Sequence, residues 1–184
     1  LIPGHSSSRD NRDNSAMAFL TSACEQVRMS PRHLNPFILK LADQNLYNPV
    51  TTWIESKPWD GVSRLQEFYS TVHSESPLKE VFIRKWLLQC VAAAFSRDGL
   101  ATQGVLTFSG GQGIGKTTWF TRLAPSELDV ILIGHTLDTK NKDSVFIALS
   151  NWIVELGELD ATMRKSDIAA LKAFVTQQED KLRR

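Results

Sequence analysis

A glycine-rich loop that ends in a lysine and a threonine carries the clearest chemical signal in this chain. Residues 110–117 read G-G-Q-G-I-G-K-T and fulfil the pattern G-x-x-x-x-G-K-[ST]. Glycines in such a loop allow backbone N–H groups to approach an anion that larger side chains would keep away. Lys116 would reach the β- and γ-phosphates, and Thr117 would offer its hydroxyl to Mg²⁺. The loop therefore predicts a site for a nucleoside triphosphate with Mg²⁺.

The predicted nucleotide contacts cover most of this loop and the residue after it. They are Gly111, Gln112, Gly113, Ile114, Gly115, Lys116, Thr117 and Thr118. An apolar run at residues 104–109 predicts a buried strand before the loop, and residues 116–123 predict a helix after it. The alternative is a structural turn followed by a chance Lys-Thr pair, but it gives no reason for the strand and the helix.

A pair of glutamates after the apolar run at residues 152–154 is the second chemical signal. A P-loop ATPase needs a carboxylate at the end of a strand, where it holds Mg²⁺ and helps to activate the attacking water. Glu155 follows the run directly, so we predict that it acts on the metal side with Thr117. Glu158 is the predicted catalytic base, and Lys116 completes the predicted catalytic set. The two glutamate roles can be exchanged, and a solvated loop charge is the alternative for Glu158.

Hydrophobic periodicity predicts helices in the first half of the chain and alternating strands and helices in the second. Residues 1–15 are rich in Ser, Asn and Asp and predict a flexible lead-in, and residues 16–100 predict a helical N-terminal domain. Residues 101–184 predict a P-loop domain, because strands alternate with helices there. The expected fold class is α/β, with a helical N-terminal region before a P-loop NTPase core built on a parallel sheet. The predicted strands are 104–109, 130–133 and 152–155, and the predicted helices are about 15–29, 36–45, 50–55, 62–72, 78–95, 116–123, 142–149 and 166–178.

The composition limits the partners that the chain can use. Lys and Arg number 21 against 20 Asp and Glu among 184 residues, so contact with DNA would need a local basic patch. Cys24 and Cys90 lie far apart without a Cys/His cluster, which predicts buried free thiols and a cytoplasmic location. No apolar run of the sequence reaches the roughly 20 residues that span a bilayer, so no membrane partner is expected.

The segment Trp59-Asp60-Gly61 forms a further short pattern. Asp-Gly is a typical turn, and a large aromatic side chain in such a segment usually fills a core. We therefore expect a structural role for this pattern, with Trp53 and Trp59 packed against other residues.

Several of these patterns, in this order, resemble the virulence-associated protein E family. The matching segments are Trp59-Asp60-Gly61 with Arg64-Leu65, the loop residues Gly110, Gly113, Gly115, Lys116 and Thr117, the box at residues 152–159, the helix at 168–176, and Asp180 with Arg183. The P-loop alone would not specify a family, whereas the three main motifs together are much more specific.

This resemblance implies an AAA+-like or superfamily 3 helicase-like ATPase that acts in replication of a phage or mobile element. It implies ATP and Mg²⁺ as cofactors, single-stranded or origin DNA as a partner, and a homo-oligomeric ring such as a hexamer. The family pattern continues into a sensor strand that is missing here, so the core is expected to be truncated at the C-terminus and to bind ATP more readily than it hydrolyses it. Candidates for an arginine finger are Arg164, Arg183 and Arg184, with solvated arginines as the alternative.

The same sequence leaves two other functions open. One is a nucleotide-gated DNA-binding or regulatory module without unwinding activity, which the near-neutral net charge favours. The other is a P-loop kinase for a small molecule, although an arginine-rich lid is not found. The salt dependence of DNA binding would separate a motor from a gate, since a translocating motor must contact several phosphates.

Overall fold

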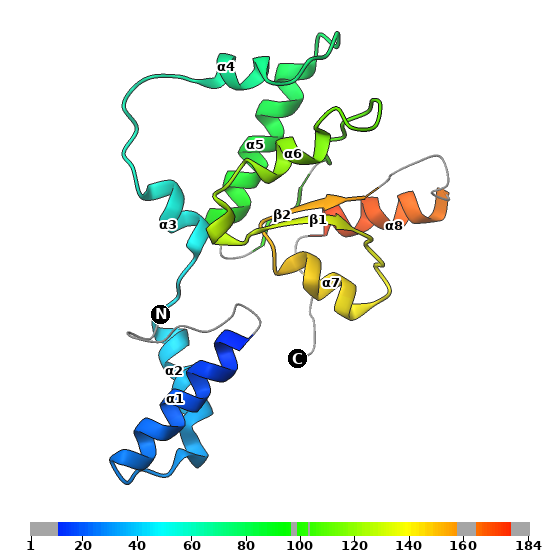
Figure 1. The fold of residues 1–184 in the computed structure, drawn as a ribbon. Helices are drawn as coiled ribbons and strands as arrows, with labels where there is room; N and C mark the ends of the chain where they lie inside the picture. Colours follow the sequence, from blue (N-terminus) through cyan, green and yellow to red (C-terminus); the bar gives the residue numbers. More distant parts are fainter. Residues whose placement is uncertain (1–10, 97–98, 103, 158–164, 178–184) are drawn as a thin grey trace. The chain divides into compact units, whose positions relative to one another are not determined.

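The chain forms a mixture of helices and strands. The computed structural model describes residues 11–96, 99–102, 104–157 and 165–177 (Figure 1). It divides into two compact units, Leu1–Tyr47 and Asn48–Arg184. This division reflects compactness alone, and the predicted domain limits at residues 15 and 100 stay predictions.

The first unit is helical, as its sequence predicts. Its elements are α1 (Arg12–Gln26), a 3₁₀ turn (Pro31–His33) and α2 (Leu34–Gln44). The Ser30 hydroxyl accepts a hydrogen bond from the Arg32 N–H at 3.4 Å, which caps the 3₁₀ turn. The predicted apolar face of α2 is not buried within the described residues, since Phe37 and Leu41 are 59% and 58% exposed.

The second unit contains the remaining helices and the sheet. Its helices are α3 (Pro49–Glu55), α4 (Leu65–Ser70), α5 (Lys79–Phe95), α6 (Lys116–Thr121), α7 (Lys142–Leu149) and α8 (Lys165–Thr176), and its strands are β1 (Ile131–His135) and β2 (Ile153–Leu156). Asparagine side chains cap two of the helices. Asn48 accepts a hydrogen bond from the Val50 N–H at 2.9 Å, and Asn141 accepts one from the Asp143 N–H at 2.9 Å. These caps fix where α3 and α7 begin, because they satisfy N–H groups that have no partner inside the helix.

A two-stranded parallel sheet lies at the centre of the predicted nucleotide-binding region. Strands β1 and β2 run side by side (Figure 1), with Ile131 opposite Ile153. The register shifts before His135 pairs with Leu156. Parallel strands need a long crossover connection, which α7 supplies. Both strands that the sequence predicts in this region are confirmed.

The predicted strand at residues 104–109 is wrong. The segment has no regular secondary structure, and within the described chain no ladder of backbone hydrogen bonds pairs it with β1 or β2. Its side chains still alternate, since Leu106 and Phe108 are half-buried and Val105 is 48% exposed. A strand also requires a hydrogen-bonded neighbour, which an apolar pattern cannot supply. The described residues therefore show a small parallel sheet with helices, and the complete P-loop core that the sequence predicts is not seen among them.

An aromatic cluster fixes α6 within the second unit. The ring of Phe108 lies 5.0 Å from the ring of Trp119 and 5.0 Å from that of Phe120, measured between centroids. Trp86 of α5 meets Phe120 edge-on at 5.6 Å, and the Trp119 indole N–H donates to the Thr71 hydroxyl at 2.8 Å. Such aromatic pairs contribute roughly 0.5–1.5 kcal/mol each beyond their burial. The cluster therefore holds the segment before the loop against α6, although that segment lies outside the sheet.

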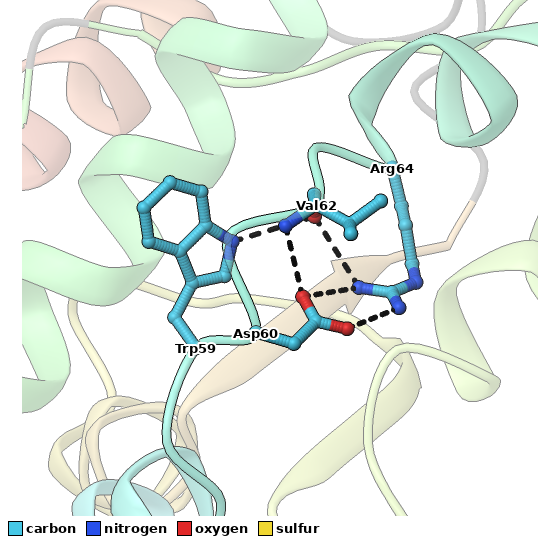
Figure 2. Close-up of polar contacts among 4 residues, drawn as sticks. All are labelled: Trp59, Asp60, Val62 and Arg64. Carbon is cyan, nitrogen blue, oxygen red and sulfur yellow. Dashed lines mark hydrogen bonds and ion pairs between the residues drawn. The ribbon is translucent and has the colours of Figure 1, made fainter.

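The Trp59-Asp60-Gly61 segment is a turn closed by polar contacts (Figure 2). The Asp60 carboxylate accepts hydrogen bonds from the Val62 N–H at 3.0 Å and from the Arg64 guanidinium at 3.1 and 2.5 Å. Gly61 has a φ of +82°, which favours glycine at this position. The Trp59 indole N–H donates to the Val62 carbonyl at 3.3 Å. Polar contacts between residues that are close in sequence therefore close the turn.

The packing prediction is confirmed for Trp53 and wrong for Trp59. Trp53 is half-buried and meets the Trp152 ring edge-on at 6.2 Å. Trp59 is 79% exposed, because the turn is closed by its polar contacts and not by burial of the indole.

The pairing of Asp60 with Arg64 predicts how the turn responds to acid. The Arg64 guanidinium, followed by the Val62 N–H, lowers the pKa of Asp60 below its ordinary value. The stability that the ionised pair contributes is therefore complete above the unfolded-state pKa and is lost as the pH falls through the lower folded-state pKa. We expect Arg64→Ala to raise the Asp60 midpoint towards its ordinary value in an NMR titration of the side-chain carboxyl. Equal midpoints in the variant and the wild type would contradict this assignment.

The two cysteines differ in burial. Cys90 is a buried free thiol, and burial raises its pKa to about 12. Cys24 is also free but only partly buried, so the prediction of two buried thiols is confirmed for Cys90 alone. None of the helices in the described ranges combines the length and the hydrophobicity needed to cross a membrane.

Candidate functional site

The loop at residues 110–115 adopts backbone conformations that favour glycine. Gly110, Gly113 and Gly115 have φ values of +151°, +80° and +86°. Residues with side chains are strained in this part of conformational space. A Cβ on Gly110 would lie 2.9 Å from Cδ1 of Ile114, but this is the end of an exposed side chain that can move aside, so the positive φ values and not a lack of space favour glycine. The glycines of the sequence pattern are therefore needed for the shape of the loop.

Lys116 lies back over the loop that precedes it. Its ammonium group donates hydrogen bonds to the carbonyl oxygens of Gly110 at 2.8 Å and Gly111 at 2.6 Å. Lys116 is the first residue of α6, and its side chain is half-buried. The geometry therefore places a fixed positive charge beside the backbone of the glycine-rich loop.

Thr117 and Glu155 meet although they are far apart in sequence. The Thr117 hydroxyl donates to Oε1 of Glu155 at 2.6 Å, across a separation of 38 residues. Thr117 belongs to α6 and Glu155 to β2, so the packing of the helix beside the sheet creates this contact. A hydroxyl and a carboxylate are oxygen donors of the kind that Mg²⁺ prefers. The two residues that the sequence predicts on the metal side therefore lie together.

The second oxygen of the Glu155 carboxylate is held by the backbone of β1. The Gly134 N–H donates to Oε2 of Glu155 at 3.0 Å. Both oxygens of the carboxylate thus accept a hydrogen bond, one from a side chain and one from the main chain. This arrangement fixes the plane of a half-buried carboxylate next to the loop.

The other predicted site residues fall into two groups. The predicted nucleotide contacts other than Lys116 are exposed, namely Gly111, Gln112, Gly113, Ile114, Gly115, Thr117 and Thr118. The predicted catalytic base and arginine-finger candidates, Glu158, Arg164, Arg183 and Arg184, lie outside the described residues.

A broad hollow opens beside the loop. Its volume is about 1390 Å³, and its lining includes Gly113, Lys116 and Thr117 from the loop region and Gly134 and Glu155 from the sheet. A smaller hollow of about 630 Å³ lies beside the turn at residues 59–65 and is lined mainly by apolar side chains. Only in the larger hollow do the loop lysine, the hydroxyl and the carboxylate converge, so we assign the candidate site there.

Two neighbours of the site escape prediction from the sequence. One is Gly134, whose N–H holds Glu155, and the other is His135, whose Nε2 lies 3.2 Å from the Ser144 hydroxyl. A glycine inside an otherwise apolar strand is a signal for a bulge and could have identified Gly134. The sequence offers no comparable signal for the contact between His135 and Ser144.

Comparison with known proteins identifies the family. No curated protein matches the chain. A model of the virulence-associated protein E-like domain matches residues 54–184, a segment that includes the turn at residue 60, the glycine-rich loop and Glu155. The match confirms the family resemblance of the sequence motifs. The chain belongs to the family of the virulence-associated protein E-like domain.

Proposed function

We propose that the chain binds ATP with Mg²⁺ at residues 110–118 and hydrolyses it in a helicase-like motor that acts on DNA. One observation carries most of this proposal. The Thr117 hydroxyl meets the Glu155 carboxylate at 2.6 Å, in the hollow that Lys116 also lines. A chance Lys-Thr pair after a structural turn gives no reason for a carboxylate from a distant strand to meet the threonine.

The residues at this point suit Mg²⁺ as part of a complex with a nucleotide. Mg²⁺ is commonly held by one or two carboxylates, with phosphates and waters as further ligands. Glu155 and Thr117 would supply the protein oxygens. Within the described chain no group of three or more His, Cys, Asp or Glu residues is placed to hold a metal by itself. When bound, Mg²⁺ would neutralise phosphate charge and polarise the terminal phosphoryl group.

Lys116 and the loop backbone would hold the triphosphate. The ammonium group can exchange its bonds to the carbonyl oxygens of Gly110 and Gly111 for stronger, charge-assisted bonds to phosphate oxygens. The hollow of about 1390 Å³ beside the loop has room for a nucleotide. Hydrolysis also needs a group that activates water. We assign that role to Glu158, and the exchanged assignment gives it to Glu155.

Family membership supports the larger part of the proposal. A virulence-associated protein E-like domain suggests a protein of a phage or mobile element. The AAA+-like or superfamily 3 helicase-like ATPase core is our proposal, which rests on the motifs at residues 110–117 and 152–159. We extend the proposal to a homo-oligomeric ring, such as a hexamer, that works on single-stranded or origin DNA.

The rate of ATP hydrolysis with and without single-stranded DNA tests this function. We expect Mg²⁺-dependent turnover that DNA stimulates, together with a larger assembly in sizing experiments when ATP is present. Absence of hydrolysis under both conditions would contradict the motor. If ATP binding persists without turnover, the result would favour the second candidate function, a nucleotide-gated DNA-binding or regulatory module.

The near-neutral charge of the chain favours that second candidate. Its formal net charge is only +1, which gives no general attraction to DNA. A motor that grips several phosphates should lose DNA affinity steeply as the salt concentration rises. A shallow salt dependence that changes with bound ATP would support the gated module.

A further inference from the structure

The carboxyl end of β1 contains an irregularity that touches the candidate site. The pairing of β1 with β2 is regular at Leu132 and shifts before His135. Gly134 lies inside this shift and has a φ of +67°. Bulges of this kind re-aim groups next to functional sites. Here the re-aimed group is the Gly134 N–H, which points at Glu155.

Each oxygen of the Glu155 carboxylate accepts one hydrogen bond. Oε2 accepts the Gly134 N–H at 3.0 Å, and Oε1 accepts the Thr117 hydroxyl at 2.6 Å. With Oε2 held by the main chain, the carboxylate cannot rotate freely about its final bond. Oε1 therefore stays directed at the loop, where the proposed metal would lie.

We infer that Gly134 is a positioning residue, whose backbone N–H directs a single oxygen of Glu155 towards Thr117 and Mg²⁺. This inference rests on the proposed function for its role with the metal. The hydrogen bond that carries it can be measured without any nucleotide.

The conformation of Gly134 explains why glycine is needed there. A Cβ built on Gly134 meets no atom of the described chain within 4 Å, so space does not limit the residue at this position. The positive φ limits the residue instead. β-Branched side chains are strongly disfavoured at positive φ, whereas asparagine tolerates it. The Gly157 N–H also donates to the His135 carbonyl at 3.3 Å and holds the strands together beyond the bulge.

A graded series at this position tests the inference. We compare ATP affinity in Mg²⁺ and in EDTA for the wild type, Gly134→Asn and Gly134→Val in the full chain. The ratio of the two affinities should fall about tenfold in Gly134→Val, as expected for a lost hydrogen bond to a charged group. Gly134→Asn should retain most of the ratio, and the affinity in EDTA should stay the same in all three proteins.

Gly61→Val is the matched control. Gly61 also has a positive φ, +82°, and its Cβ would likewise meet no atom within 4 Å. It lies in the turn at residue 60, which holds none of the proposed nucleotide ligands. We expect it to lose stability without any change in the Mg²⁺ ratio, so the control separates general strain from positioning.

An NMR measurement judges the contact separately from the function. In Glu155→Gln the amide proton of Gly134 should move upfield, while that of Gly61 should not. An unmoved Gly134 amide overturns the inference whatever the protein binds, as does an unchanged Mg²⁺ ratio in Gly134→Val. If the amide moves but the wild type shows no Mg²⁺-dependent binding, the contact is supported, and both its metal role and the proposed function are overturned.

Discussion

Replacing Lys116 with alanine is expected to weaken ATP binding by about 10- to 100-fold. The ammonium group lies over the loop, with carbonyl contacts at 2.8 and 2.6 Å. Hydrogen bonds to charged groups are worth roughly 1.5–3 kcal/mol, which corresponds to about 10- to 100-fold in a dissociation constant. Calorimetric titration of the full chain with ATP and Mg²⁺ measures the change.

A second lysine provides the control for this experiment. Lys85 is exposed on α5, and Lys85→Ala removes the same charge away from the loop. It should bind ATP as the wild type does. A loss of the fold would also abolish ATP binding, so thermal unfolding serves as a second control. It should show that Lys116→Ala is folded. Equal affinities for Lys116→Ala and Lys85→Ala would remove Lys116 from the site.

Replacing Glu155 with glutamine is expected to reduce Mg²⁺-dependent ATP binding and turnover by about 100-fold. Glutamine has nearly the same shape, and its carbonyl oxygen can still accept one of the two hydrogen bonds, from Thr117 or from Gly134. What it lacks is the negative charge and the second acceptor oxygen. Changes to groups that orient metal ligands already cost about 10- to 100-fold, so loss of a ligand itself should reach the upper end of that range.

The matched control and the second glutamate make this experiment decisive. Glu127→Gln changes an exposed acid within the 3₁₀ helix η3 (Ser126–Leu128) and should leave both quantities unchanged. Glu158→Gln should keep Mg²⁺-dependent binding and lose turnover if Glu158 is the base. The opposite pattern, with binding lost in Glu158→Gln and kept in Glu155→Gln, would exchange the two roles.

Local sequence signals account for the elements that were predicted well. The predicted helix at residues 142–149 is confirmed. Asn141 caps it, and its buried residues Val145 and Ala148 lie three positions apart on one helix face. Strand β2 is also confirmed, since an apolar run bounded by polar residues suits a buried strand. In both cases the information lies within a few residues of the element.

Features that depend on distant partners could not be predicted in the same way. Residues 104–109 have the pattern of a strand, but pairing depends on which chain segment lies alongside. Trp59 is apolar enough for a core, but burial requires a distant surface that covers the ring, and the indole stays 79% exposed among the described residues. The glycine inside β1 is a local signal for a bulge at Gly134, but the register that directs its N–H at Glu155 depends on both strands.

The residues of the site also differ in how far they could be predicted from the sequence. Residues 110–118 are adjacent in sequence, so their motif could be identified directly. The assignment of Glu155 required the expectation that a strand end would reach the loop, and the contact with Thr117 shows the two residues together. The Gly134 N–H is a backbone group, and only its position in the folded chain connects it to Glu155.

The affinity of the wild-type chain for ATP, titrated in Mg²⁺ and again in EDTA, tests the central claim most directly. The proposed site predicts saturable binding with one ATP per chain that Mg²⁺ strengthens, with this strengthening lost in Glu155→Gln. Absence of saturable binding in Mg²⁺, or equal affinity in Mg²⁺ and EDTA, would contradict a Mg²⁺-nucleotide site formed by Lys116, Thr117 and Glu155.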